Sequence, residues 1–397
     1  GALGALGALG GGAGGGAAAL AAVAGVVAVH EAGHFLAARA QGIRVEKFSI
    51  GFGPVLFKWA AGGVEYSLRA LPLGGFVAFP TSARLEAEAG GSAAEPRGVG
   101  AADKDPARKY EADDPDLLEN RSVLQRLVVV SAGVAANLLL ATALMDRQAL
   151  TVGIPEVTVL PGVEVPMVIA GAPAELAGLR EGDVIRSIDG RDVSAEPGTV
   201  DRLAALIKQR AGGEVDLIVE SRGDAAGAPG HLVRVLPEER DGAGYAGVQM
   251  VQPVERSRVV ASGPLDGLRL SARYVGKTCG DIAHALAGVV LDPAANMGNL
   301  SGPVKIVQVG AEFVDKDKLS GLIEFATIIS LNLAVVNSVP FPGLDGWQAA
   351  LLTLEGARRG EKLSRELESS LSYVGLLTVG SALAYSIFMD TLGAAMK

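Results

Sequence analysis

Two histidines and a glutamate near the amino end have the types and spacing of a metal site. Residues 30–34 read His-Glu-Ala-Gly-His. On a helix, positions four residues apart share one face, so His30 and His34 can bind one metal ion. Neutral imidazoles suit Zn²⁺, and a catalytic zinc keeps three protein ligands and one position for water. We therefore predict zinc at His30 and His34, with Glu31 as the base that accepts a proton from the attacking water. The alternative, two core histidines paired with neighbours, is costly inside an apolar helix.

A third ligand is expected from a segment near the carboxyl end. Residues 337–346 read Asn-Ser-Val-Pro-Phe-Pro-Gly-Leu-Asp-Gly, so two prolines end an apolar helix just before one carboxylate. An unpaired Asp345 at that place would be costly, and binding to zinc would remove the cost. The two remaining histidines, His231 and His284, are interpreted as surface or packing residues.

Four apolar stretches have the length of a membrane span, which needs about 20 helical residues. They are Ala17–Ala40, Leu127–Met145, Leu322–Val339 and Leu371–Met389. The first contains the histidines and the third ends at the proline-rich segment, and ionisable groups at such a depth are usually functional. With 49% hydrophobic and 20% charged residues, the composition favours a mainly α membrane protein with about four transmembrane helices. A soluble α/β enzyme with long buried helices is the alternative.

The segments between these spans differ in character. Val45–Phe79 alternates apolar and polar residues between glycines, which predicts a membrane-associated β-hairpin region. Residues 80–119 are polar and predict a loop. Residues 156–252 predict a soluble α+β module, whose Ala-Gly-Leu-Arg-Glu-Gly-Asp run at 177–183 resembles a PDZ domain of the protease-associated type. Leu265–Phe313 is ambiguous: a helix with glycine breaks that could lie along the membrane.

The domain organisation follows from these segments. A low-complexity amino end at 1–16 precedes an amino-terminal core at 17–155 with two spans. The PDZ-like domain occupies 156–252, and a carboxyl-terminal core with the other two spans occupies 253–397.

Together the motifs resemble the site-2 protease family of intramembrane zinc metalloproteases. The resemblance rests on His-Glu-x-x-His, on Gly-Phe-Gly-Pro at 51–54, on the single PDZ-like insert and on the 337–346 segment, and it covers most of the chain. It implies an intramembrane metalloprotease core with one Zn²⁺ per chain. The implied metal ligands are His30, His34 and Asp345, the implied catalytic residue is Glu31, and the implied substrate-positioning or site-supporting residues are Asn137, Asn337, Pro340 and Pro342. Two positions depart from the family pattern: Val134 stands where many members have Pro, and Trp347 where a second Gly is usual.

The function implied by the resemblance is zinc-dependent endopeptidase cleavage of transmembrane segments. The expected partners are transmembrane protein substrates, the lipid bilayer and a peptide or chain end bound by the PDZ-like domain. The net charge of −9 argues against nucleic acid. A plastid membrane, inner envelope or thylakoid, is favoured over a bacterial-type inner membrane. The alternatives are an inactive membrane scaffold that uses the PDZ-like module and a transporter with an ion in its broken helix.

Overall fold

The computed structural model describes residues 13–80, 114–196, 198–221, 230–240, 242–292 and 302–361, together with single positions at 370, 371, 373, 375 and 381. The chain forms two compact units. The first consists of residues 1–154 and 260–397, and the second of residues 155–259.

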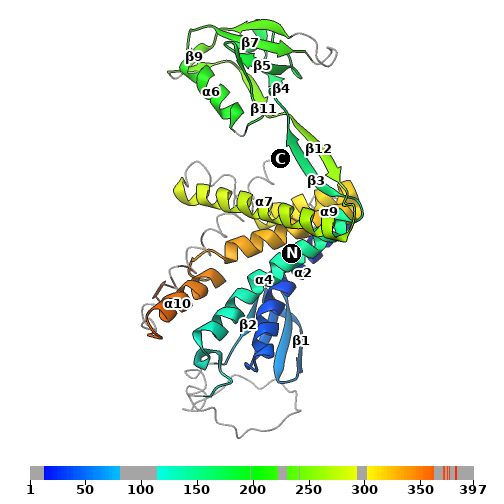
Figure 1. Cartoon of the computed structure of the whole chain (residues 1–397), viewed down its shortest axis with the longest axis vertical. Coiled ribbons are helices and arrows are strands. Elements are labelled where there is room, and N and C mark those ends of the chain that lie inside the picture. Colours follow the sequence, from blue (N-terminus) through cyan, green and yellow to red (C-terminus); the bar gives the residue numbers. More distant parts are fainter. Residues whose placement is uncertain are drawn as a thin grey trace. The chain divides into compact units, whose positions relative to one another are not determined.

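The first unit is a helical assembly. Its helices are α2 (Ala13–Ala40), η1 (Leu118–Asn120), α4 (Val123–Ala149), α7 (Pro264–Leu291), α9 (Pro303–Asn337) and α10 (Asp345–Ala357). Helices α2, α4 and α9 all pack against one another, and α10 packs against α4 (Figure 1). A capping box begins α4: the Ser122 hydroxyl accepts from the Gln125 backbone N–H, and the Gln125 side chain accepts from the Ser122 N–H.

Three of the described helices are long and apolar enough to cross a membrane: Gly14–Ala40, Val123–Ala149 and Pro303–Asn337. They contain most or all of the first three predicted spans. The fourth predicted span, Leu371–Met389, lies outside the described residues except for a few isolated positions. Four spans therefore stay a prediction.

Helix α9 is two helices joined by a sharp bend. Asp317 and Lys318 have non-helical backbone angles, and φ at Lys318 is 42°. Beyond the bend the chain comes back on itself, because a Cβ at Gly321 would lie 1.8 Å from the Phe313 carbonyl oxygen. Of the ambiguous region 265–313, the described residues 265–291 lie in α7 and residues 303–313 lie in the first part of α9. The glycines there lower helix propensity, but packing of these helices on α4 and α2 outweighs that cost.

A small sheet lies beside α2 and is built from two long, bent strands. Strands β1 (Lys47–Ala61) and β2 (Val64–Ala78) are antiparallel and joined by a tight turn with positive φ at Gly62 and Gly63. Lys47 pairs with both Glu65 and Ala78, so the first part of β1 lies between the two halves of β2. Gly51 and Gly53 in β1 and Gly74 in β2 have positive φ, and both strands continue through these positions. Large apolar side chains are exposed on β1, among them Leu56, Phe57 and Trp59.

The second unit is an α+β module around one hydrophobic core. Its main sheet has the order β11-β4-β5-β7-β8, with β6 beside β5. The elements are β3 (Ile154–Val159), β4 (Val163–Val168), α5 (Pro173–Leu176), β5 (Val184–Ile188), β6 (Arg191–Asp192), α6 (Thr199–Gln209), β7 (Val215–Glu220), β8 (His231–Val235), β9 (Glu238–Arg240), β10 (Ala243–Tyr245), β11 (Val248–Val251) and β12 (Val254–Val259). Alternate residues of β4, β5 and β7 meet Leu203 and Ile207 of α6 in the core. Strand β11 forms one edge of the sheet.

Candidate metal centre

Helix α2 carries His30, Glu31 and His34, and all three are buried. They are buried because α2 and α4 approach very closely. A Cβ at Gly33 would lie only 2.4 Å from the carbonyl oxygen of Ala132 on α4. The glycine between the two histidines therefore lets the helices touch, and the histidine face of α2 turns into the bundle.

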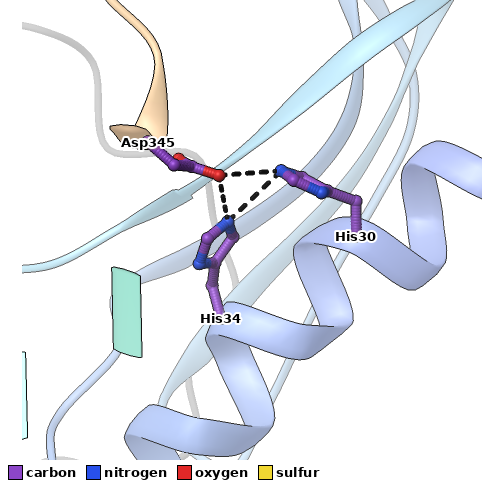
Figure 2. Close-up of side chains that lie close together, drawn as sticks. All are labelled: His30, His34 and Asp345. Atoms are coloured by element: carbon purple, nitrogen blue, oxygen red, sulfur yellow. Dashed lines mark hydrogen bonds and ion pairs between the residues drawn. The ribbon is translucent and has the colours of Figure 1, made fainter. Parts of the chain in front are cut away.

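The structure brings His30, His34 and Asp345 together (Figure 2). The Asp345 Oδ2 atom lies 3.1 Å from His30 Nε2 and 3.2 Å from His34 Nε2, and the two Nε2 atoms are 3.4 Å apart. Figure 2 shows the two imidazoles leaving the same helix and the carboxylate reaching them from a separate segment. Three candidate ligand atoms thus converge from opposite ends of the sequence.

The triangle of these atoms fits a tetrahedral zinc ion. Ligand atoms about 2.1 Å from such an ion lie about 3.4 Å from one another. Asp345 Oδ2 is buried without a hydrogen-bond donor among the described residues, so its lone pairs point at the imidazole nitrogens. Lone pairs facing one another at this distance repel unless a cation lies between them. The donor set of two nitrogens and one oxygen matches a catalytic site that keeps one position open.

The ring of His34 is fixed from behind by α4. Its Nδ1 lies 2.8 Å from the backbone oxygen of Val129. A carbonyl can only accept, so Nδ1 carries the proton and Nε2 presents its lone pair to the metal position. This is the arrangement that orients metal-binding histidines in general.

Asn137 takes the corresponding place behind His30. Its side-chain amide lies 3.2 Å from His30 Nδ1, and its Oδ1 is buried without a partner. With the amide turned by half a turn, Oδ1 would accept the Nδ1 proton of His30, which leaves Nε2 free for a metal. The backbone oxygen of Asn137 accepts a hydrogen bond from Ser330 on α9. The structure therefore places Asn137 against a candidate ligand.

Gly133 is a site residue whose role the sequence alone does not predict. A Cβ there would lie 2.3 Å from His34 Nε2 and 2.8 Å from His30 Cε1. Only glycine leaves room for both imidazoles against α4. The available signal was a glycine in the middle of an apolar helix, where helix propensity argues against one.

Asp345 is the first residue of α10, which follows α9 after a short connection, residues 338–344. The next residue, Gly346, crosses the end of α9 so closely that a Cβ would lie 2.4 Å from the Val339 oxygen. Asn337 is the last residue of α9, and Pro340 and Pro342 lie in the connection between the two helices. The connection thus places the Asp345 carboxylate beside the two histidines.

Glu31 faces the sheet. A Cβ at Gly75 on β2 would lie 2.7 Å from Glu31 Cγ, so this strand passes directly over the proposed base. His231 and His284, by contrast, are exposed on β8 and α7. No metal-ligand group of three or more His, Cys, Asp or Glu residues other than His30, His34 and Asp345 occurs in the part of the chain that the structure describes.

Comparison with known proteins gives one consistent result. The profile of Peptidase family M50 matches residues 18–381. The chain is 37% identical over 368 residues to the membrane metalloprotease ARASP of Arabidopsis thaliana, described as chloroplastic, covering 92% of this chain and 76% of that protein. It is 35% identical over 366 residues to a protein of the cyanobacterium Synechocystis named as a zinc metalloprotease, covering 92% and 91%. The zinc metalloprotease RasP of Shouchella clausii is 26% identical over 414 residues, covering 89% and 93%.

Proposed function

The chain belongs to peptidase family M50, the site-2 protease family of membrane zinc metalloproteases, and from this premise we propose that it cleaves transmembrane segments of other proteins. The proposed zinc ligands are His30, His34 and Asp345. The observation that carries the proposal is the convergence of three candidate ligand atoms, 3.1 to 3.4 Å apart, among helices apolar enough to span a bilayer. The cofactor of this protein is zinc, and the protein resides in a membrane of plastid or bacterial type.

The side chains around the metal position suit peptide hydrolysis. Bound zinc supplies a Lewis acid that polarises the scissile carbonyl and acidifies water. Glu31, adjacent to His30 in sequence and pointing at β2, accepts the proton of the attacking water and passes it to the departing amide nitrogen. The Val129 oxygen holds the His34 imidazole in the tautomer that keeps Nε2 unprotonated, and Asn137 would do the same for His30 with its Oδ1 turned toward Nδ1.

A substrate helix must be extended before its peptide bonds become accessible. Among the described residues, the segment of β2 around Phe76–Ala78 lies at the edge of its sheet, next to the strand position that contacts Glu31. An extended substrate that pairs with this edge would pass the base. We propose that Asn337, Pro340 and Pro342, beside the carboxylate, hold the unwound substrate, because irregular backbone at this depth needs a cavity lined by protein.

The second unit has a groove suited to a peptide. The groove has a volume of about 360 Å³ and lies between α6 and β11, lined by Ala204 and Ile207 on one side and Val248 and Met250 on the other. Strand β11 is the sheet edge, so a chain can add to it as a further strand. We propose that this unit is a PDZ domain that binds a chain end or an extended peptide.

The proposal is tested by metal content and cleavage in the reconstituted full-length protein. Wild-type protein should contain about one zinc per chain and should cut a transmembrane peptide embedded in vesicles. A chelator should abolish the cut and added zinc restore it, while His30→Ala should lose both metal and activity. Stoichiometric zinc without any cleavage would instead favour a membrane scaffold, and metal-independent cleavage would refute the mechanism. A plastid inner envelope or thylakoid location is proposed from the chloroplastic relative and is tested by fractionation.

A further inference from the structure

A buried ion pair joins α4 to α10 away from the metal position. The guanidinium Nη2 of Arg126 contacts Glu355 Oε1, and the two side chains are only 12% and 10% exposed. Arg126 also donates from Nε to the Arg121 backbone oxygen, at 3.1 Å. Next to Glu355, Gly356 lies against Val123, where a Cβ would be 3.5 Å from the valine methyl. The end of α10 is therefore fixed on the first turn of α4.

The same face of α4 also contacts the two histidines of the metal site. Arg126, Val129, Gly133 and Asn137 follow one another at intervals of three, four and four residues, which places them in one row along the helix. From the amino end, they contact the end of α10, the His34 ring, both imidazoles and the His30 ring. Helix α4 thus contacts both histidines and the end of α10, so it can fix their positions relative to one another.

Helix α10 carries the third candidate ligand at its other end. Asp345 begins the helix and Glu355 follows ten residues later, a distance of about 15 Å along the axis. A tilt of about 4° over that length moves the far end by about 1 Å. Metal ligands tolerate errors of only about 0.2 Å. The position of Asp345 is therefore sensitive to how the carboxyl end of α10 is held.

We propose that Arg126 and Glu355 are positioning residues for the metal site, acting through α10 to hold Asp345 against the two histidines. This inference rests on the proposed ligand set. A pair that only stabilised the fold would affect the metal site with or without the Asp345 carboxylate. A pair that acts through Asp345 can affect metal affinity only while that carboxylate is present.

The test is a double-mutant cycle on zinc affinity, measured by chelator competition on the full-length protein in detergent. Glu355→Gln should weaken zinc binding by about tenfold to a hundredfold. In an Asp345→Asn background the same substitution should have no further effect. The charge-swapped variant Arg126→Glu/Glu355→Arg should recover most of the loss. The absorption spectrum of the Co²⁺-loaded protein should shift in Glu355→Gln toward that of Asp345→Asn.

Glu361→Gln is the matched control, because Glu361 pairs with Arg358 just beyond the same helix but is exposed. It should leave zinc affinity unchanged. An equal loss from Glu355→Gln in both backgrounds, or no loss at all, overturns the proposal. If Glu355→Gln does not fold, Arg126→Lys replaces it in the same cycle, with the same two outcomes. Asp345→Asn that binds zinc like the wild type would instead refute the ligand set, so the two failures are distinguishable.

Discussion

At the scale of single residues, neighbouring side chains of the candidate metal centre have different roles. His30 and His34 present lone pairs, whereas Glu31 between them points toward β2 and does not belong to the ligand triangle. Binding and proton transfer should therefore be separable by mutation.

Glu31→Gln should keep zinc and lose cleavage. The amide has nearly the same shape but cannot accept the water proton, so the rate should fall by about 10² to 10⁴. Zinc content and the cleavage rate of a vesicle-embedded peptide, measured on the same sample, decide the matter. Turnover near the wild-type rate would remove Glu31 from the mechanism, and loss of zinc would make it a ligand.

Gly133→Ala should weaken zinc binding by at least tenfold, because the new methyl would lie 2.3 Å from His34 Nε2. Alanine has a higher helix propensity than glycine, so propensity alone predicts that Gly133→Ala would stabilise the helix. The matched control is Gly25→Ala on α2, where a Cβ meets nothing within 4 Å. Metal affinity of the two variants, compared with their thermal unfolding, separates the steric effect from a general one. Unchanged affinity in Gly133→Ala would contradict the close contact.

At the scale of elements, the sequence predicts what depends on local pattern and misses what depends on contacts between distant segments. Spans one to three follow from apolar length, and the three candidate ligands, His30, His34 and Asp345, follow from spacing and residue type. The reversal inside α9 does not, because it depends on Gly321 fitting beneath the Phe313 carbonyl. The pairing of Arg126 with Glu355, 229 residues apart, leaves no local signal either. The bent path of β2, both halves of which pair with β1, likewise depends on contacts between segments and not on local pattern.

The groove between α6 and β11 should bind peptides, and Ala204→Trp should block it, because Ala204 lines the groove. The adjacent residue Ala205 is exposed, so Ala205→Trp is the matched control. Binding of a fluorescent peptide pool with free carboxyl ends should weaken by at least tenfold in the first variant only, a change of about 1.4 kcal/mol. Equal binding by both variants would mean that the groove is passive.

Deletion of residues 156–252 should leave zinc content intact and alter which substrates are cut.

At the scale of the whole molecule, the distribution of basic residues predicts how the chain crosses the membrane. The segment 353–370 carries Arg358, Arg359, Lys362 and Arg365, and the end of the first span is flanked by Arg39, Arg44 and Lys47. Short basic loops stay on the cytoplasmic or stromal face, so the 155–259 unit should face the opposite compartment. Helix α7 is not among the described helices that are long and apolar enough to cross a membrane.

Cysteine labelling tests this topology, starting from Cys279→Ser to remove the single native thiol. A new cysteine at exposed Ser194 should react only from the outer side of the membrane, and one at Ser364 only from the inner side. An unmodified Cys279→Ser protein is the control for background labelling. Reaction of both new thiols from the same side would refute the four-span arrangement.

The convergence of ligand atoms from α2 and α10 has a consequence for the lifetime of the protein. A metal ion held there acts as a staple between the two ends of the chain, and it closes a very long loop much as a disulfide would. Removing the staple restores the repulsion among three lone pairs and makes opening of the bundle easier, because an ion that binds only the folded form stabilises it. Cellular zinc supply would then affect how much of this protease stays folded and escapes degradation. Scarcity of zinc would lower the amount of the protein as well as its activity.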